Sequence, residues 1–359
     1  MVNCLLLGGC GFVGKHLVTF LVESNACSYI RVVDKTFPEV ANLSPQQQKA
    51  FGSPSVEYMQ SNLGSGAGIT KAFALENGSW DFVFNMTGDA KYGQNIDVYR
   101  QRHLIPSQLA ADASLRSGVK KFIHFSTSQI YAPKDKASKE ADKLKPWTNL
   151  ATVHLETESV LSKMGGLPLV ILRPAVIYGV GDINGLMPRI SIAAVYKYIG
   201  KTMEFLWSGD LRINTVHVSD VCRAAWFCAQ SAPEGAIYNL VDKNDTNQRK
   251  INEILEPIFG IKTGFKSAIV SRLASAAMKA TTARVNGMHG DVWAVMTRDA
   301  KINFTPYNAF LDQELLYNHP LSANGDTIES LGFQYEVPYL TVDTLETTVG
   351  CCGRDEVVP

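Results

Sequence analysis

The sequence has no excess of charge of either sign and no long apolar run. Lysine plus arginine and aspartate plus glutamate number 34 each among 359 residues, so no net field attracts the chain to nucleic acid or anionic lipid. No run of 18 apolar residues occurs, which argues against a transmembrane helix. The N-terminus shows no basic flank or cleavage site of a secretory signal. We therefore expect a cytoplasmic protein that binds a small molecule and no nucleic acid.

The sequence also lacks the cysteine and histidine spacings that are typical of metal sites. Its seven cysteines form no CxxC pair, and no histidines follow one another at metal-binding intervals. The cysteines are Cys4, Cys10, Cys27, Cys222, Cys228, Cys351 and Cys352. Scattered thiols in an odd number indicate a reducing compartment and no bound metal. The adjacent Cys351 and Cys352 could carry lipid, but idle thiols on a loose tail are the simpler interpretation.

The N-terminal stretch VNCLLLGGCGFVGKHLVTFLVES reads as an apolar strand, a glycine-rich turn and a helix. Gly8, Gly11 and Gly14 have GxxGxxG spacing, which allows the backbone to turn sharply and approach a pyrophosphate. Phe12 and Val13 open the helix, whose free N–H groups and dipole favour phosphate at this end. We expect these five residues to contact a dinucleotide.

A second predicted strand, YIRVVDK, ends in an acid at the position where a dinucleotide fold holds its ribose. Asp34 lies about 20 residues beyond Gly14, and a carboxylate there accepts hydrogen bonds from the ribose hydroxyls of NAD. The same charge repels the 2′-phosphate of NADP, although Lys35 could soften that repulsion. The predicted cofactor is therefore NAD.

Later segments continue the alternation of strands and helices that is typical of a doubly wound sheet. We expect further strands within residues 55–63, 80–88, 120–132 and 167–179, and helical stretches at about 66–77 and 96–117. Pro106 is expected to break the second of these stretches. The fold class is thus α/β, a Rossmann-type doubly wound parallel sheet with a smaller, mixed C-terminal substrate domain.

The expected domain organisation follows this pattern. The NAD-binding domain spans residues 1–178 and receives a later return of about 213–242, the substrate domain spans 179–345, and 346–359 form a tail. Within the substrate domain, 251–260 is a predicted helix ended by Gly260. Residues 265–285 form a basic amphipathic pattern; it could lie on a membrane surface, but a packed helix with a solvated basic face is preferred.

In order along residues 1–240, the motifs GGCGFVG, FNMTG, FIHFSTSQIYA, ILRPAVIYGVGD and INTVHVSDV resemble those of the extended short-chain dehydrogenase/reductases. This group includes NAD-dependent epimerases, dehydratases and 3β-hydroxysteroid dehydrogenases. The resemblance implies further cofactor contacts from Asn62 and Leu63 at the adenine, Met86, Thr87 and Gly88 beneath the cofactor, and Pro174 near the nicotinamide. It also implies that Thr127 hydrogen-bonds a substrate carbonyl, and that the protein could pair as a homodimer.

The central Tyr-x-x-x-Lys motif of that family is missing. None of the 13 tyrosines is followed by lysine four residues later. When Glu158 is aligned with a glutamate that the family often carries, the lysine position falls on His154 and the tyrosine position on Leu150. Leu150 cannot exchange a proton, and a histidine with an ordinary pKa is mostly neutral at physiological pH. His154 is then either a packed or ribose-contacting residue, or an acid–base group acting with Thr127.

Other departures bear on the substrate. Val176 stands where sugar-nucleotide members often have asparagine, and His103, Pro106 and Ser107 replace the family's Asn-x-x-Gly-Thr. Arg212 nevertheless falls where those members place a diphosphate-binding arginine. A sterol, a sugar nucleotide and a small carbonyl compound all remain possible ligands. We predict an NAD-binding, divergent or non-catalytic member; the alternative is an active oxidoreductase or epimerase that uses Thr127 and His154.

Overall fold

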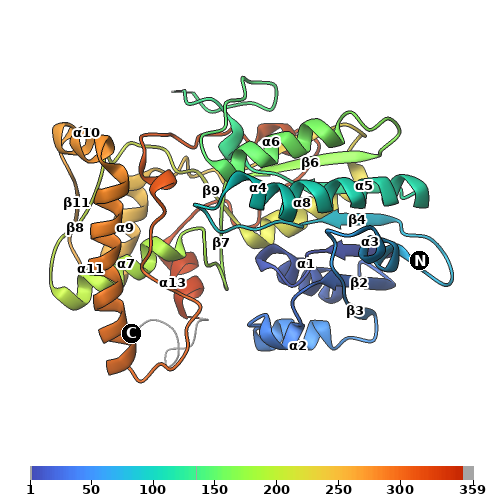
Figure 1. The fold of residues 1–359 in the computed structure, drawn as a ribbon, viewed down its shortest axis with the longest axis horizontal. Helices are drawn as coiled ribbons and strands as arrows, with labels where there is room; N and C mark the ends of the chain where they lie inside the picture. Colours follow the sequence, from blue (N-terminus) through green and yellow to red (C-terminus); the bar gives the residue numbers. More distant parts are fainter. Residues whose placement is uncertain (1, 135, 351–359) are drawn as a thin grey trace.

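The computed structural model describes residues 2–134 and 136–350, and its centre is a seven-stranded parallel sheet. The sheet strands are β1 (Asn3–Leu7), β2 (Tyr29–Asp34), β3 (Val56–Gln60), β4 (Phe82–Asn85), β5 (Lys121–Phe125), β6 (Leu169–Pro174) and β10 (Ile237–Leu240). Their order is β10-β6-β5-β4-β1-β2-β3, so successive strands are added on one side of β1 up to β3 and on its other side from β4 onward. The predicted doubly wound sheet is confirmed (Figure 1).

Helices cover both faces of the sheet. These are α1 (Phe12–Glu23), α2 (Pro45–Phe51) and α8 (Val218–Ser231) on one face, and α3 (Gly66–Phe73), α5 (Ile105–Ser117) and α6 (Asn149–Leu161) on the other. Alternate residues of β1 feed the two cores: Cys4 and Leu6 pack with α1 and α8, whereas Leu5 and Leu7 pack with α3 and α5. Because β1 is buried on both faces, consecutive residues of it, such as Leu5, Leu6 and Leu7, are all apolar.

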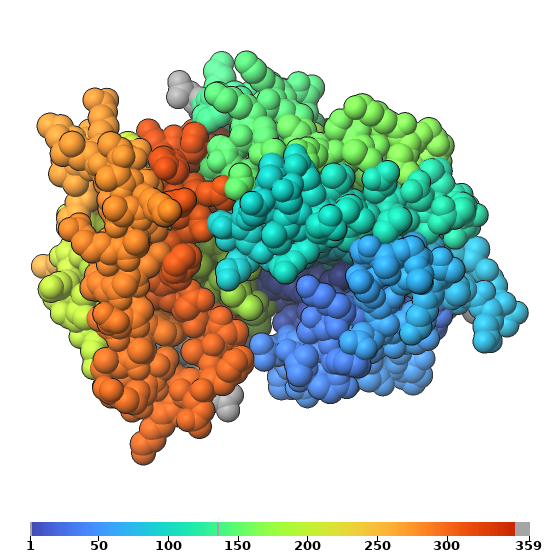
Figure 2. Space-filling view, viewed as in Figure 1, coloured from blue at the N-terminus to red at the C-terminus, as the bar shows by residue number. Residues whose placement is uncertain are grey.

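The remaining elements belong either to the loops at the edge of the sheet or to a second, mostly helical part of the chain. They are η1 (Pro38–Val40), α4 (Ile96–Tyr99), the π-helix η2 (Arg100–Leu104), η3 (Ser128–Ile130), β7 (Val176–Tyr178), α7 (Met187–Ile199), β8 (Met203–Phe205), β9 (Thr215–His217), α9 (Gln248–Phe259), β11 (Thr263–Phe265), α10 (Ala268–Ala276), α11 (Met278–Asp299), η4 (Gln313–Leu316), α12 (Asp326–Glu329) and α13 (Val342–Gly350). Helices α7, α9 and α11 share a separate core. Figure 2 shows α10 and α11 (orange) at one side of the molecule and the N-terminal residues (blue) at the other, with orange-red residues of the C-terminal part between them.

The chain passes between the two parts several times. The predicted strand 167–179 divides at Ala175, so that β6 stays in the main sheet while β7 pairs with β9. Strand β10 and helix α8 lie in the expected return, 213–242. Leu321, Ile328 and Phe333, expected in the substrate domain, belong instead to the core beneath the main sheet. The expected tail boundary at 346 falls inside α13, and 351–359 lie outside the described residues.

Two helical predictions need correction. The stretch 265–285 is not one helix, because α10 ends at Ala276 and α11 begins at Met278. The expected packing of the apolar face of this stretch is not seen along α10, because Ile269, Val270 and Leu273 are exposed. Within the described residues, no helix combines the length and hydropathy needed to cross a bilayer.

Pro106 does not end the helical stretch 96–117. The segment runs from α4 through the π-helix η2 into α5, where Pro106 occupies the first turn. Proline has no N–H to donate to the preceding turn, and a wider π-turn is one way a helix accommodates that loss. The turn carries His103 into the interior.

A buried ion pair joins α6 to the sheet. Arg173 on β6 donates two hydrogen bonds to the Glu158 carboxylate, at 3.0 and 2.6 Å, and both side chains are at most 5% exposed. Arg173 also donates to the Tyr131 hydroxyl at 2.8 Å, and that hydroxyl donates to Asn239 at 2.7 Å. The network thus connects β6, α6, the segment after β5, and β10.

Replacing Glu158 by alanine should destabilise the protein by about 3–5 kcal/mol, because the Arg173 guanidinium would remain buried without a counter-charge. The double variant Glu158→Leu/Arg173→Met should lose less stability than Glu158→Ala, since it leaves no unpaired charge in the core. Urea unfolding of both variants measures the difference. As a control, Glu156→Ala on the same helix removes only the partly exposed pair with Arg100 and should cost no more than about 1 kcal/mol. Equal losses for the two single variants would contradict the assignment.

Candidate cofactor and ligand site

The glycine turn after β1 has the shape that a bound pyrophosphate requires. Gly8 has φ +79°, and a Cβ there would lie 2.8 Å from the Met86 carbonyl oxygen. A Cβ on Gly14 would lie 2.6 Å from Gly9, so α1 packs against the turn only with glycine there. Gly11 is different: a Cβ on it would approach only the Gly8 carbonyl, at 3.2 Å. Its bare surface at the start of α1 leaves room for an anion.

Asp34 lies beside this turn at the end of β2. Its carboxylate accepts hydrogen bonds from the backbone N–H of Cys10 and of Thr36, both at 3.0 Å. These bonds hold the acid against the turn. Asn62 is exposed after β3 and Leu63 is buried in the core. Asp34, Asn62 and Leu63 do not line the cavity described next, so their roles toward ribose and adenine stay predictions.

A cavity of about 480 Å³ begins at the glycine turn and extends to the C-terminal part. The predicted site residues on its wall are Gly8, Gly11, Phe12, Val13, Gly14, Met86, Thr87, Gly88, Thr127, Leu150, His154 and Pro174. They come from the ends of β1, β4, β5 and β6 and from α6, the edge where doubly wound folds bind their ligands. The structure therefore brings most of the predicted site together.

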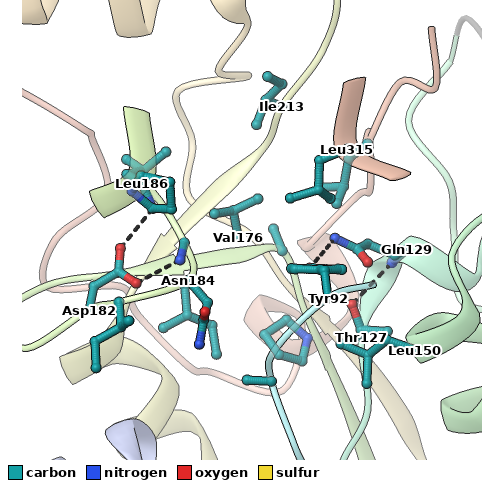
Figure 3. Close-up of a pocket in the computed structure, with 18 of the residues that line it drawn as sticks. Tyr92, Thr127, Gln129, Leu150, Val176, Asp182, Asn184, Leu186, Ile213 and Leu315 are labelled. Carbon is teal, nitrogen blue, oxygen red and sulfur yellow. Dashed lines mark hydrogen bonds between the residues drawn. The ribbon is translucent and has the colours of Figure 1, made fainter. Parts of the chain in front are cut away.

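The far wall of the cavity is mainly apolar. Its apolar side chains include Val176, Ile177, Leu186, Phe205, Leu206, Trp207, Leu211, Ile213, Leu311, Leu315, Leu316 and Leu321. Figure 3 shows Tyr92, Thr127, Gln129 and Leu150 grouped at one side, and Asp182, Asn184 and Leu186 at the other, with Val176 between them. The C-terminal part thus closes the cavity opposite the sheet.

Leu150, at the predicted tyrosine position, presents an apolar side chain to the cavity. Leu150 is 7% exposed and packs with Tyr99 and Val153. The helix that carries it begins at Thr148, whose hydroxyl accepts the N–H of Ala151 at 3.0 Å. This cap fixes the start of α6. Leu150 therefore faces the cavity in a rigid setting.

A tyrosine from another segment reaches the same side of the cavity. The Tyr92 hydroxyl accepts a hydrogen bond from the Gln129 side chain at 2.7 Å, and the Gln129 backbone N–H donates to the Thr127 hydroxyl at 3.2 Å. Burial raises the pKa of Tyr92 above its usual value. Sequence reasoning missed Tyr92, which belongs to no motif, and Gln129, which lies within the motif FIHFSTSQIYA but at a position to which the resemblance assigns no role.

His154 lies within a cluster of three histidines. Its ring centroid is 4.1 Å from that of His103, which in turn is 5.5 Å from that of His124. Burial lowers the pKa of His103 to about 4 and holds the pKa values of His124 and His154 well below their usual range. All three are therefore neutral at physiological pH, and His154 cannot supply the positive charge of the family's lysine. The three rings lie close together although their positions have no metal-binding spacing along the sequence, and the expectation of no bound metal stays a prediction.

One arginine on the cavity wall has no counter-charge. Arg189 of α7 donates to the Gln248 side chain at 2.7 Å and lies over the Phe205 ring, 3.9 Å from its centroid. Its second terminal nitrogen is buried without a partner, and no ion pair to it forms among the described residues. Burial lowers its pKa to about 9. Arg212 also lines the cavity, but it pairs with Asp245 at 2.8 Å.

The start of α7 is held by a buried acid. Asp182, 1% exposed, accepts hydrogen bonds from the backbone N–H groups of Gly185, Leu186 and Met187 at 2.7–3.2 Å. Burial raises the pKa of Asp182 to about 6, despite these three donors. The acid thus determines where α7 begins and where Arg189 enters the cavity.

A parallel sheet of this order, with a glycine turn and an acid after its first two strands, defines a dinucleotide-binding protein of the Rossmann class. The family model described as "NAD dependent epimerase/dehydratase family" matches residues 4–240. The chain belongs to this family. The predicted family is confirmed, and NAD is the cofactor that the family uses.

The curated proteins that the chain resembles include both a hydroxysteroid dehydrogenase and a sugar-nucleotide dehydratase. The chain is 25% identical over 242 residues to 3beta-hydroxysteroid-dehydrogenase/decarboxylase isoform 1 of Arabidopsis thaliana, covering 64% of this chain and 52% of that one. It is 21% identical over 285 residues to a dTDP-glucose 4,6-dehydratase of an Actinoplanes species, covering 76% and 86%. An uncharacterized protein of Sinorhizobium fredii is 23% identical over 286 residues, and the match spans 66% of its length.

Solved structures have the same fold over nearly the whole chain. UDP-glucuronic acid 4-epimerase from Bacillus cereus, in complex with UDP-glucuronic acid and NAD, matches with a TM-score of 0.68 at 16% identity, covering 97% of this chain and 98% of its own. The Thermus thermophilus UDP-glucose 4-epimerase complex with NAD gives 0.68 at 17%, covering 98% and 100%. The α/β fold with its C-terminal part is therefore that of these enzymes.

Replacing Gly11 by arginine should abolish NADH binding, because the side chain would fill the space that the turn leaves for the phosphates. Calorimetric titration with NADH and NADPH measures the effect. Gly66→Arg is the matched control: Gly66 is exposed at the start of α3, and a Cβ there meets nothing within 4 Å. Unchanged NADH affinity in Gly11→Arg would show that the cofactor lies elsewhere.

Proposed function

We propose that the protein binds NAD together with an anionic second ligand of the nucleotide-sugar type, and that it lacks the ordinary proton relay of its family. The observation that carries this proposal is the wall of the cavity at α6. Leu150 and His154 occupy the two relay positions, one apolar and one neutral, beside an intact glycine turn. A positioned acid–base group typically contributes about 10²–10⁴-fold to a rate. Conventional dehydrogenase activity should therefore be weak or absent.

Asp34 supports NAD as the dinucleotide. Its carboxylate lies at the end of β2, beside the turn. At this place in the fold an acid binds the ribose hydroxyls and repels a 2′-phosphate. The NADPH arm of the titration above tests the same preference.

Arg189 supports an anionic second ligand. Arg189 is half-buried, but one of its terminal nitrogens is fully buried and unpaired. A guanidinium in this setting without a carboxylate partner is costly, and an anion in the cavity would reduce that cost. The arginine lies at the far wall, beyond the expected nicotinamide end, where a ligand's phosphate could reach it. Arg212 could join it by exchanging Asp245 for the ligand. A neutral sterol would suit the apolar wall but would leave Arg189 unpaired.

Replacing Arg189 by glutamine should weaken the binding of UDP- and dTDP-sugars by about 10–100-fold, the loss expected for one charged hydrogen bond. NADH affinity should not change. Calorimetry with sugar nucleotides and hydroxysteroids measures both. Arg249→Gln is the control, because Arg249 is half exposed, pairs with Asp210 and does not line the cavity. Binding of hydroxysteroids but not of sugar nucleotides would favour the sterol interpretation.

A second candidate function is an active enzyme in which Tyr92 replaces the missing tyrosine. The Tyr92 hydroxyl lies in the cavity and is linked through Gln129 to Thr127. Its raised pKa keeps it protonated, so it could donate a proton. Among the described residues, the groups that act on its pKa are Gln129, Tyr99, Glu314 and Asp312, none of them a cation. Thr127 would orient the substrate carbonyl, as the family resemblance implies.

Restoring the relay should create activity. The double variant Leu150→Tyr/His154→Lys should oxidise sugar nucleotides at least about 10²-fold faster than the natural protein. Absorbance of NADH, followed over a panel of sugar nucleotides and hydroxysteroids, measures the rates. Robust turnover by the natural protein would contradict the missing relay. Its loss in Tyr92→Phe would then assign the proton donor to Tyr92.

A further inference from the structure

Three histidines from three different elements meet at the cavity wall. His103 comes from the π-helix η2, His124 from β5 and His154 from α6. One ring nitrogen from each lies within 4.8 Å of those of the other two. Neither resemblance nor spacing predicts this group, because the three positions are far apart in the sequence.

Each of these rings keeps one nitrogen without a partner. Nε2 of His103, Nε2 of His124 and Nδ1 of His154 are all buried and receive no hydrogen bond. His103 and His124 are 2% and 0% exposed. A buried polar atom without a partner is unfavourable, and native structures rarely leave several together. Three such atoms at one place indicate a shared ligand that accepts lone pairs.

Neighbouring groups hold the first two rings in suitable orientations. His103 donates from Nδ1 to the Thr87 carbonyl at 2.6 Å, which leaves a lone pair on Nε2. Asn85 pairs in register with His124 and contacts its Nδ1 at 3.1 Å. As placed, the Asn85 amide nitrogen donates to His124 Nδ1 and to the Ser107 hydroxyl, and its oxygen accepts from the Thr87 hydroxyl at 2.7 Å. A lone pair on Nε2 of His124 requires the inverted amide, whose oxygen accepts from the His124 ring and from Ser107 while its nitrogen donates to the Thr87 hydroxyl. Contacts of this kind orient metal-binding histidines.

We propose that His103, His124 and His154 form a binding site for a divalent transition metal of the zinc class. Three neutral imidazoles suit Zn²⁺ and similar ions, whereas Mg²⁺ and Ca²⁺ require oxygen ligands. The π-helix that presents His103 fits this interpretation, because such wide turns frequently occur at functional sites. The proposal depends on the three rings and not on the proposed function, so either can fail alone.

To bind an ion, the three rings need to move only slightly closer together, and one side of the site is open to the cavity. Zinc–nitrogen bonds of about 2.0–2.1 Å place tetrahedral ligand atoms roughly 3.3 Å apart. The widest pair must therefore approach by no more than about 1.5 Å, which side-chain rotation can provide. His103 and His154 line the cavity. A fourth ligand, water or a group of the bound molecule, would come from that side.

Metal binding by the full chain tests the proposal. Chelator-treated protein is titrated with Co²⁺, whose visible absorption reports four-coordinate geometry, and Zn²⁺ is then added as competitor. We expect one ion per chain, displaced by Zn²⁺ and unaffected by Mg²⁺. His103→Gln and His154→Gln should each weaken binding by at least about 100-fold. His289→Gln, which replaces a similarly buried histidine of the C-terminal part, should have no effect.

X-ray absorption on the zinc-loaded natural protein gives a readout that does not depend on the variants folding. Three imidazole ligands are expected in its fine structure. Absence of stoichiometric binding, fewer than three imidazoles, or binding that survives both His103→Gln and His154→Gln would overturn the proposal. A water molecule would then be the partner of the three nitrogens.

Discussion

The buried ion pair between Arg173 and Glu158 fixes the geometry on which the site depends. It anchors α6 to β6, and through Tyr131 and Asn239 it reaches the outer strand β10. Helix α6 carries Leu150 and His154, and β6 ends in Pro174. The pair holds α6 against β6, so Leu150 and His154 keep their place beside Pro174 on the sheet side of the cavity. Glu158 and Arg173 thus have a structural role that does not depend on which residues stand at positions 150 and 154.

The glycine turn does not depend on the residues at the predicted relay positions. The dinucleotide turn is stabilised by close backbone contacts at Gly8 and Gly14 and by the bonds to Asp34. None of these involves Leu150 or His154. Leu150 in turn packs with Tyr99 and Val153, as a core residue does. The shape of the cofactor turn is therefore independent of the side chains at positions 150 and 154.

The cavity joins two parts of different character. Its sheet side is built from strand ends and glycines, and its far side from apolar side chains with Arg189 among them. Asp182 determines where α7 starts, so one buried carboxylate places the unpaired guanidinium. The histidine group lies on the sheet side, next to Thr87. The anionic ligand and the metal ion proposed here would thus occupy opposite ends of one space.

Local sequence patterns were sufficient for the strand–turn–helix at residues 2–24, the acid at Asp34, the order of the main strands and the vacancy in the Tyr-x-x-x-Lys motif. Each depends on residues close together in the chain, where backbone geometry and periodicity leave few alternatives. Tertiary structure alone decided the rest. The split at Ala175, the return of Leu321 and Phe333 to the main core, the unpaired state of Arg189 and the meeting of His103, His124 and His154 all arise from contacts between distant segments. Such contacts depend on how the sheet and helices pack in three dimensions, and no spacing along the chain encodes them.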